Sequence, residues 1–307
     1  MSISYDYYKT FYYVATYRSF NKAASVLSVS QPNLSRAITR LENELGCKLF
    51  IRSSTGVTLT NEGKDLFSHV EVAFRHISEG EKLIGSSEKY KGGLLKIGIS
   101  SELTPRMVST IIVPVIHIFH NDYPDVRIEI RHASSIKLAS DVANNLMDIA
   151  FVTTPYNESI KKAPYNKKVL HSYQDIIIAG NSFQDLKDRT VSLKELIDYP
   201  IICLGSGTET ADYCYRNMFS ESGLEFSPSI ETSSTGQILT YTIENLGIGF
   251  IYPKDASTAI EDGKLFKVNI KEKQATRYIA MLSNIKDKST TKIFEQMMKD
   301  HLGKLVS

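Results

Sequence analysis

Residues 30–46, SQPNLSRAITRLENELG, place amide, hydroxyl and guanidinium groups at spacings that suit contact with a nucleic acid. Apolar residues recur every three or four positions from Leu34 to Leu45, which predicts a helix with one buried face. Ser30 stands at the expected N-cap, and Pro32 falls in the first turn, where its missing N–H is not needed. Because amides pair with adenine and guanidinium groups with guanine or phosphate, the polar face is a candidate surface for reading DNA. Its side chains belong to Gln31, Asn33, Ser35, Arg36, Thr39, Arg40 and Asn43.

Two predicted helices precede this segment, and a predicted hairpin follows it. Residues 7–19 carry an apolar stripe at helical spacing, and small alanines within residues 19–27 let another helix approach closely. The β-prone runs 48–52 and 57–60 flank a polar turn. This order is that of a winged helix-turn-helix, whose third helix would enter the major groove with Arg52 and the wing near phosphates. A small helical domain with a solvated polar face would show the same pattern, so the pattern alone leaves both interpretations open.

Positive charge is concentrated at the amino end of the chain. Residues 1–60 carry seven cationic and three anionic side chains, a net charge of +4, whereas the whole chain of 307 residues is at +2. This distribution is typical of a polyanion-binding module joined to a nearly neutral body. The first residues lack the pattern of a secretory signal, apolar runs of about eighteen residues do not occur, and the three cysteines lack metal-binding spacing. We therefore expect a cytoplasmic protein that does not interact with a membrane.

The segment from residue 19 to residue 67 closely resembles the amino-terminal signature of LysR-type transcriptional regulators. Asn33 and Cys47 depart from that signature, and Asn33 bears on which bases would be preferred. So many matches at fixed spacing favour DNA binding far more strongly than a lone short motif would. The matching positions are Ser19-Phe20, Ala23-Ala24, Leu27, Ser30-Gln31-Pro32, Leu34-Ser35, Ile38, Leu41-Glu42, Leu45-Gly46, Leu49-Phe50, Arg52, Leu59-Thr60 and Gly63.

The resemblance implies a bacterial, sequence-specific regulator of transcription and not an enzyme. It places Arg52 and Thr55 near the DNA backbone, and we expect Gln31 and Arg36 to read bases. For each residue taken singly, a phosphate contact or a solvated side chain is the alternative. The full candidate DNA-binding set is Ser30, Gln31, Pro32, Asn33, Ser35, Arg36, Thr39, Arg40, Arg52 and Thr55.

A long connecting helix is predicted over residues 61–89, after the winged domain at residues 1–60. Leu66, Val70, Ala73, Ile77 and Ile84 follow alternating steps of four and three with Gly80 in the gap, which is typical of a coiled-coil seam of about three heptads. A helix packed on its own domain is the alternative. The LysR family dimerises through such a helix and commonly forms tetramers, so the resemblance implies a homodimer or homotetramer. A hinge is predicted at residues 90–93.

The remaining residues, 94–307, alternate short β-rich runs with helical stretches, which predicts an α/β fold with mainly parallel sheets. We expect two lobes joined by crossing strands, with a cleft between them. Lobe I would hold residues 94–168 and 266–307, so that the run KLFKVNI and the helix over 290–302 return to it, and lobe II would hold residues 169–265.

Hydroxyl-rich segments follow the predicted strands of both lobes. In open parallel sheets, ligands bind at the strand carboxyl ends beside helix N-termini, so these hydroxyls suit a small anion such as a carboxylate. Ordinary N-capping would place Ser and Thr there without any ligand. The candidate ligand-binding residues are Ser100, Ser101, Ser134, Thr153, Ser206, Thr208 and Thr235.

The carboxyl-terminal half resembles the effector-binding domain of LysR-type regulators, which is itself similar to periplasmic solute-binding proteins. The motifs NLMDIAFV and ENLGIGFIYP carry this looser resemblance. It implies that a small metabolite binds between the lobes and modulates DNA binding, and the hydroxyl-rich segments favour an anionic one. The expected partners are double-stranded promoter DNA, the effector and further copies of the chain, with RNA polymerase a further candidate.

No catalytic or metal-binding set is recognised, and no cofactor is predicted. His117 and His120 are three residues apart in an apolar helix, but no Cys, Asp or Glu completes a metal site with them. Cys203 lies in an apolar run without a flanking cation, and Arg216 points away from Cys214 on a helix, so inert thiols are expected rather than a redox switch. Two rival functions are a solute-binding transport component and an enzyme with a DNA-binding head; the amino-terminal module and the missing catalytic set favour a regulator.

Overall fold

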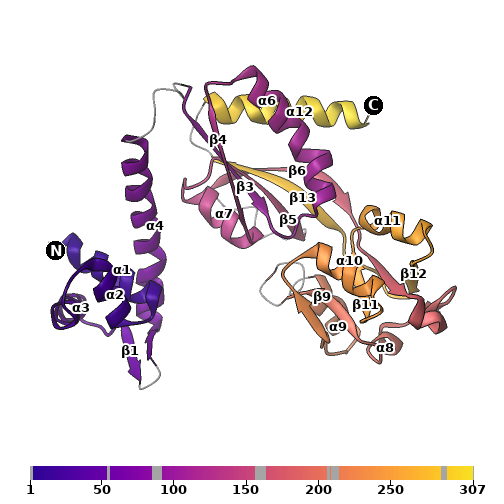
Figure 1. Ribbon diagram of the computed structural model, residues 1–307, viewed down its shortest axis with the longest axis horizontal. Helices are drawn as coiled ribbons and strands as arrows, with labels where there is room; N and C mark the ends of the chain where they lie inside the picture. The colour runs from indigo at the N-terminus through magenta and orange to yellow at the C-terminus, as the bar shows by residue number, and fades with distance from the viewer. Residues whose placement is uncertain are drawn as a thin grey trace. The chain divides into compact units, whose positions relative to one another are not determined.

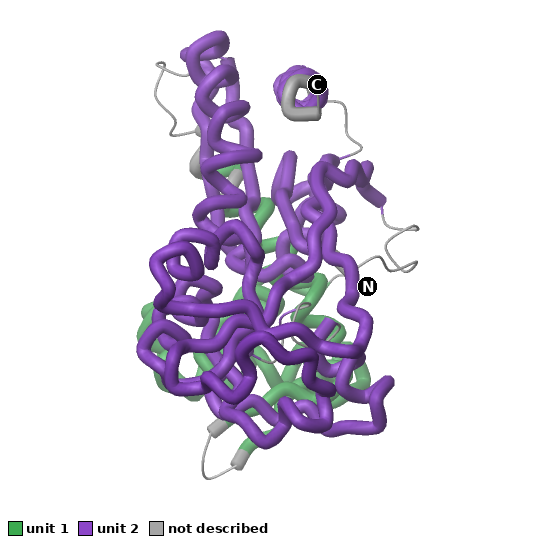
Figure 2. Tube along the Cα trace, turned by 90° about the vertical axis from the view of Figure 1, so that its right-hand side faces the viewer, with its two compact units in different colours: residues 1–87 green, residues 88–307 purple. Residues whose placement is uncertain are grey.

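The computed structural model describes residues 3–53, 56–84, 92–155, 164–205, 208, 214–284 and 289–306. The chain divides into two units, residues 1–87 and residues 88–307, which Figure 2 colours green and purple. Both expected folds are confirmed: the first unit is a winged helix-turn-helix with a long helix, and the second is a two-lobed α/β domain.

Three short helices and a two-stranded hairpin build the core of the first unit. Ser19 caps the second helix by accepting a hydrogen bond from the Lys22 backbone N–H (3.3 Å), and Ser28 ends that helix in the left-handed region. Phe11 and Ile38 are fully buried at the centre of the helix cluster. The elements are α1 (Tyr5–Tyr17), α2 (Phe20–Leu27), α3 (Gln31–Leu45), β1 (Phe50–Ser53), β2 (Gly56–Leu59) and α4 (Asn61–Ile84), with β1 and β2 antiparallel.

The long helix α4 packs its first half against its own domain. The Tyr12 ring of α1 stacks on Phe67 and Phe74 of α4, with centroids 5.9 and 4.8 Å apart. Val70 of the predicted seam is buried in this core, whereas Ala73 is exposed and Ile77 is 41 % exposed. Packing on its own domain therefore applies to the first half of α4, and pairing with a second copy stays a prediction for the exposed positions.

The predicted hinge at residues 90–93 is described only at its last two residues. The Gly92 N–H donates to the Asp125 carbonyl (3.0 Å), and the Gly93 carbonyl accepts from the Arg127 N–H (2.9 Å). Gly93 has a φ of +98°, which favours glycine. Both glycines are thus tied to the first sheet of the second unit.

Lobe I is built on a five-stranded mixed sheet with the order β4-β3-β5-β13-β6. Helices α6 and α12 cover one face of this sheet and α7 covers the other (Figure 1). Phe294 of α12 packs against Phe119 of α6 and Phe151 of β5, so the predicted return of the last helix to lobe I is confirmed. The elements are β3 (Leu94–Ser100), α5 (Pro105–Met107), η2 (Val108–Ile112), α6 (Val113–Asp122), β4 (Arg127–Ala133), α7 (Ser135–Ala143), β5 (Ile149–Pro155), β6 (Tyr165–Tyr173), β13 (Arg277–Asn284) and α12 (Ser289–Val306).

Lobe II is built on a six-stranded mixed sheet with the order β10-β9-β11-β7-β12-β8. Its core includes the fully buried Ile177 and Phe219. The elements are β7 (Ile176–Gly180), η4 (Asn181–Leu186), β8 (Thr190–Val191), α8 (Leu193–Leu196), β9 (Ile201–Leu204), α9 (Arg216–Glu221), β10 (Ile230–Thr232), α10 (Thr235–Ile243), β11 (Ile248–Ile251), α11 (Pro253–Glu261) and β12 (Leu265–Ile270).

The lobe boundaries differ from the predicted ones at both places where the chain passes from one lobe to the other. β6 continues to Tyr173, so lobe I extends beyond residue 168, and β12 pairs with β7 and β8, so the run KLFKVNI belongs to lobe II. β13, beginning at Arg277, is the strand that returns to lobe I between β5 and β6. The alternating apolar pattern of β12 suits either sheet, and only its burial of Phe266 and Val268 in lobe II decides between them. Among the described residues, no helix has both the length and the apolarity needed to cross a membrane.

Candidate DNA-binding face and ligand cleft

The leading end and outer face of α3 are exposed, as its sequence pattern predicts. Leu34, Ile38 and Leu41 are buried beneath it. The Ser30 hydroxyl accepts a hydrogen bond from the Asn33 N–H (3.4 Å), so Ser30 serves as the helix cap. The exposed candidate side chains of this helix are those of Gln31, Pro32, Asn33, Arg36, Thr39 and Arg40, while Ser35 is half-buried.

Several of these side chains already bond within the domain. The Thr39 hydroxyl donates to the Ser35 carbonyl (3.0 Å), and the Arg40 guanidinium donates to the Tyr7 hydroxyl (3.2 Å). Arg52 of the wing donates to the Ser35 hydroxyl (3.3 Å). The Arg52 guanidinium carbon also lies 4.3 Å from the centroid of the Phe20 ring, so Arg52 ties the hairpin to the helices.

Gln31, Asn33 and Arg36 stand apart from that group. Their side chains form no hydrogen bond or salt bridge with any other residue in the part of the chain that the structure describes. They extend from the first turns of α3, where the helix dipole adds positive potential. These three side chains are therefore the ones available to a DNA duplex without breaking an internal contact; Thr55 lies outside the described residues.

Glu42 holds the wing against α3 and was recognised from the sequence only as part of the family signature. Its carboxylate, 5 % exposed, accepts hydrogen bonds from the Lys48 ammonium (2.7 Å) and from the Leu49 (3.0 Å) and Phe50 (3.4 Å) backbone N–H groups. Burial acts to raise the pKa of Glu42, but these bonds outweigh it and leave the pKa below its usual value. Gly63 of α4 allows that helix to approach the backbone at Leu49 closely, because an added Cβ would lie 2.2 Å from the Leu49 carbonyl oxygen.

In lobe I, the predicted hydroxyl cluster comes together, but it surrounds a carboxylate of the chain itself. Ser100 and Thr153 are almost fully buried, and the Ser100 hydroxyl lies 2.9 Å from that of Ser135. The Glu102 carboxylate, 2 % exposed, accepts hydrogen bonds from the Thr153 hydroxyl (3.2 Å) and the Ser135 N–H (3.4 Å). Glu102, which sequence reasoning missed, thus occupies the place beside the start of α7 that was expected to receive an acidic ligand.

The other predicted ligand residues of lobe I bond to the backbone. The Ser101 hydroxyl donates to the Ala133 carbonyl (3.4 Å) at the exposed end of β3. The Ser134 hydroxyl caps α7 by accepting from the Lys137 N–H (3.3 Å). Both lie at the expected edge of the sheet, in the capping roles that were the alternative interpretation.

In lobe II, Thr235 begins α10 and lines a cavity between the lobes together with Glu102 of lobe I. The Thr208 hydroxyl donates to the Gly205 carbonyl (3.0 Å), while Ser206 lies outside the described residues. The interlobe cavity measures only about 10 Å³, which is room for about one water molecule. A metabolite could therefore enter only if the cavity widened.

A buried ion pair stands beside this cavity, where the strands cross from one lobe to the other. Arg277 and Asp175, 5 % and 6 % exposed, form a salt bridge of 2.6 Å. The Tyr215 hydroxyl donates to the same carboxylate oxygen (2.8 Å). The other oxygen of Asp175 and the Tyr173 hydroxyl are buried without a hydrogen-bond partner among the described residues. The sequence contains one weak signal for this pair: Asp175 directly precedes an apolar run, and Arg277 opens another.

The electrostatics of this site keep the Arg277 guanidinium in its charged form. Burial acts to lower the pKa of Arg277, but Asp175 more than offsets it, and the pKa lies well above its usual value. Burial raises the pKa of both Tyr173 and Tyr215, so these phenols stay neutral.

The thiols and histidines stay outside this site. Burial raises the pKa of the Cys203 thiol to about 12, which agrees with the expected inert thiol, and Cys214 is also buried. The His117 ring lies 3.1 Å from the Asn121 amide on the same helix. Within the described ranges, no three His, Cys, Asp or Glu side chains gather as a metal site would require.

Comparison with known proteins gives a consistent result over both units. Residues 5–64 match the family model described as the bacterial regulatory helix-turn-helix protein of the lysR family, and residues 89–301 match the LysR substrate binding domain. The chain is 28 % identical over 279 residues to a probable RuBisCO transcriptional regulator of Trieres chinensis, covering 88 % of this chain and 87 % of that one. It is 25 % identical over 257 residues to the HTH-type transcriptional regulator AlsR of Bacillus subtilis (strain 168), covering 84 % and 80 %.

Similarity to solved structures extends over the full length. The crystal structure of CbnR, a LysR family transcriptional regulator, matches with a TM-score of 0.61 and 14 % identity. The match covers 97 % of this chain and 99 % of that chain. At this identity the likeness shows a shared fold.

Proposed function

The chain belongs to the LysR family of transcriptional regulators, and we propose that it binds promoter DNA in pairs under the control of a metabolite between its lobes. It is a DNA-binding regulator with an effector-binding domain, and its relatives are named as regulators rather than enzymes. The observation that carries the proposal for this chain is the exposed set Gln31, Asn33 and Arg36, whose side chains form no internal bond in the described structure.

In this proposal α3 enters the major groove. Gln31 and Arg36 read base edges, since an amide matches adenine and a guanidinium matches guanine. Arg40 and Arg52 lie toward the phosphates, and their contacts with Tyr7 and Ser35 hold the guanidinium groups in place before DNA binds. Ser30 and Pro32 shape the leading end of the helix, and Thr39 lies farther along its exposed face.

Pairing of two chains would present two copies of α3 to two half-sites. The exposed Ala73 and Ile77 of α4 support pairing along that helix, because an apolar stripe of a coiled coil is buried only by its partner. A homodimer or a homotetramer would both satisfy this requirement. RNA polymerase is a candidate partner, since a promoter-bound regulator can act on transcription by contacting it.

The effector would be a small metabolite with an acidic group. Thr235, which begins α10 and lines the cavity, supports an anion contact on the lobe II side. Glu102 of lobe I and, where the strands cross, the Asp175 oxygen that lacks a partner among the described residues favour hydrogen-bond donors at the other end of the effector. Because the cavity is nearly closed, such an effector would act by favouring a wider arrangement of the lobes.

Native mass spectrometry of protein purified from its host tests the effector chemistry. The expected bound species has an acidic group and at least one amine or hydroxyl. A Thr235→Val variant should bind it about two- to tenfold more weakly, the effect of one lost hydrogen bond. Thr240→Val, on the same helix and exposed, should retain it. A bound species without an acidic group, or equal retention by both variants, would contradict the proposal.

A gel-retardation experiment with DNA from upstream of the protein's own gene tests DNA binding. Retardation at low ionic strength is expected, with an affinity that falls as salt rises because each neutralised phosphate releases counterions. A shuffled fragment of the same composition is the control. Small-angle scattering at the same protein concentration should show a dimer or larger assembly. Failure to retard the natural fragment better than the shuffled one would remove the DNA-binding role as proposed.

A further inference from the structure

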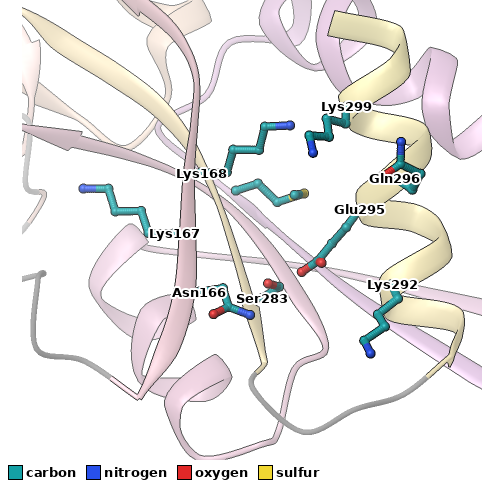
Figure 3. A pocket seen from close by; sticks show the side chains of 9 residues that line it. Asn166, Lys167, Lys168, Ser283, Lys292, Glu295, Gln296 and Lys299 are labelled. Carbon is teal, nitrogen blue, oxygen red and sulfur yellow. The ribbon is translucent and has the colours of Figure 1, made fainter.

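A groove on lobe I, remote from the interlobe cavity, lies between β6, β13 and the last helix α12. Its volume is about 450 Å³, within the size of pockets that hold metabolites. Figure 3 shows Lys168 of β6 and Lys299 of α12 extending toward one another over it. Met281 of β13, paired in register with Lys168, contributes an apolar side chain to the same groove.

Cationic groups dominate the lining of this groove. Four lysines contribute to its lining against the single carboxylate of Glu295, although the Lys167 side chain extends away from α12 (Figure 3). Neither Lys168 nor Lys299 forms a salt bridge with any other described residue. Burial and the repulsion by the neighbouring ammonium of Lys299 lower the pKa of Lys168, and the carboxylates of Glu295 and Asp300 offset this only in part.

An anion placed between these ammonium groups would remove that repulsion. Glu295 does not fill the place, because its carboxylate is directed toward Ser283 at the other end of the groove (Figure 3). The thioether of Met281 and the aliphatic stems of the lysines add apolar surface for the rest of a ligand. We propose that this groove is a second ligand site, which binds a small organic anion with an apolar body.

The groove and the interlobe cavity occupy different parts of the same strands. β6 runs from Asn166 and Lys168 at the groove to Tyr173 at the interlobe cavity. β13 runs from Arg277 at that cavity to Ser283 at the groove. Within the described part of the chain the two linings share no residue, so each site can be altered without replacing a residue of the other.

Fluorine NMR titration of the full-length protein with 4-fluorophenyl phosphate tests this proposal. Saturable binding is expected, and the neutral analogue 4-fluorophenol should bind about tenfold more weakly because it lacks the charge-assisted hydrogen bonds. The double variant Lys168→Gln/Lys299→Gln should also weaken binding about tenfold. Lys194→Gln, which removes the same charge from an exposed position on α8, should change the affinity less than about twofold.

A variant that is expected to bind the phosphate more tightly distinguishes the loss of a ligand contact from misfolding, because misfolding can only weaken binding. Glu295→Gln removes the one carboxylate of the lining and should tighten binding of the phosphate about two- to threefold. The proposal is overturned if the wild-type protein shows no saturable binding, or if the double variant binds as the wild type does. It is also overturned if the double variant instead loses promoter DNA in gel retardation, because the groove would then contact the DNA backbone.

Discussion

Replacing Arg277 by methionine is expected to lower the free energy of unfolding by about 3–5 kcal/mol, since this leaves the Asp175 carboxylate buried without its counter-charge. The remaining hydrogen bond from Tyr215 reaches only one carboxylate oxygen, and the other has no hydrogen-bond partner in the described ranges of the chain. Urea unfolding followed by circular dichroism measures the loss. Few single replacements in this chain should have a larger effect, because the pair is among its most deeply buried charges.

Arg189→Met is the matched control for this experiment. Arg189 also pairs with a carboxylate, that of Glu195 at 3.3 Å, but its side chain is 57 % exposed. Solvent screening limits such pairs to about 0–1 kcal/mol. The double variant Asp175→Asn/Arg277→Met should recover part of the loss, because it removes the uncompensated charge. Equal losses from Arg277→Met and Arg189→Met would show that burial of the pair has no energetic consequence.

Arg36→Ala is expected to lower the affinity for the natural upstream fragment at least tenfold while leaving the assembly state unchanged. A bidentate contact to guanine contributes about 1–3 kcal/mol of discrimination, and pairing of two chains would remove it from both half-sites. Arg36 has no internal bond to a described residue, so its loss should not disturb the fold. Fluorescence anisotropy of labelled DNA measures the affinity, and scattering measures the assembly.

Lys9→Ala, which removes a positive charge from an exposed position on α1, is the control and should change the affinity less than about threefold. Base reading predicts that Arg36→Ala relaxes preference at one position of the site. A uniform loss over all sequences would instead assign Arg36 to a phosphate, and an unchanged footprint would exclude it from the interface.

The local architecture of the DNA-binding unit can be predicted from its amino-acid pattern. Ser30 caps α3, Gly46 ends it at a φ of +71°, and Leu34, Ile38 and Leu41 are buried as their spacing predicts. Each of these features depends on hydrogen bonds or side-chain directions within a few residues, so the sequence pattern contains the necessary information. The same reason explains why the exposed face with Gln31 and Arg36 was predicted correctly.

In the effector domain, sequence reasoning found the hydroxyl groups but not what they bind. Ser100 and Thr153 meet at the edge of the sheet as expected for strand ends, yet Glu102 bonds to Thr153 from 51 residues away. The loop after β3 turns its carboxylate inward, a result that no periodicity encodes. The proposal that the effector is acidic is consequently supported only by the residues that lobe II contributes to the cavity.

Which strand joins which lobe, and which charges pair where the lobes meet, depends on long-range packing that the sequence pattern does not reveal. β12 and β13 are both short strands with apolar residues, but β12 pairs in lobe II and β13 in lobe I. Arg277 bonds to Asp175, which is 102 residues away in the sequence. Such pairings depend on the burial and register of segments that are distant in the sequence, not on the secondary-structure preference of neighbouring residues. A buried charge needs a counter-charge, and a buried strand edge needs another strand to accept its hydrogen bonds. The cationic groove on lobe I arises in the same way, from lysines that β6 and α12 bring together.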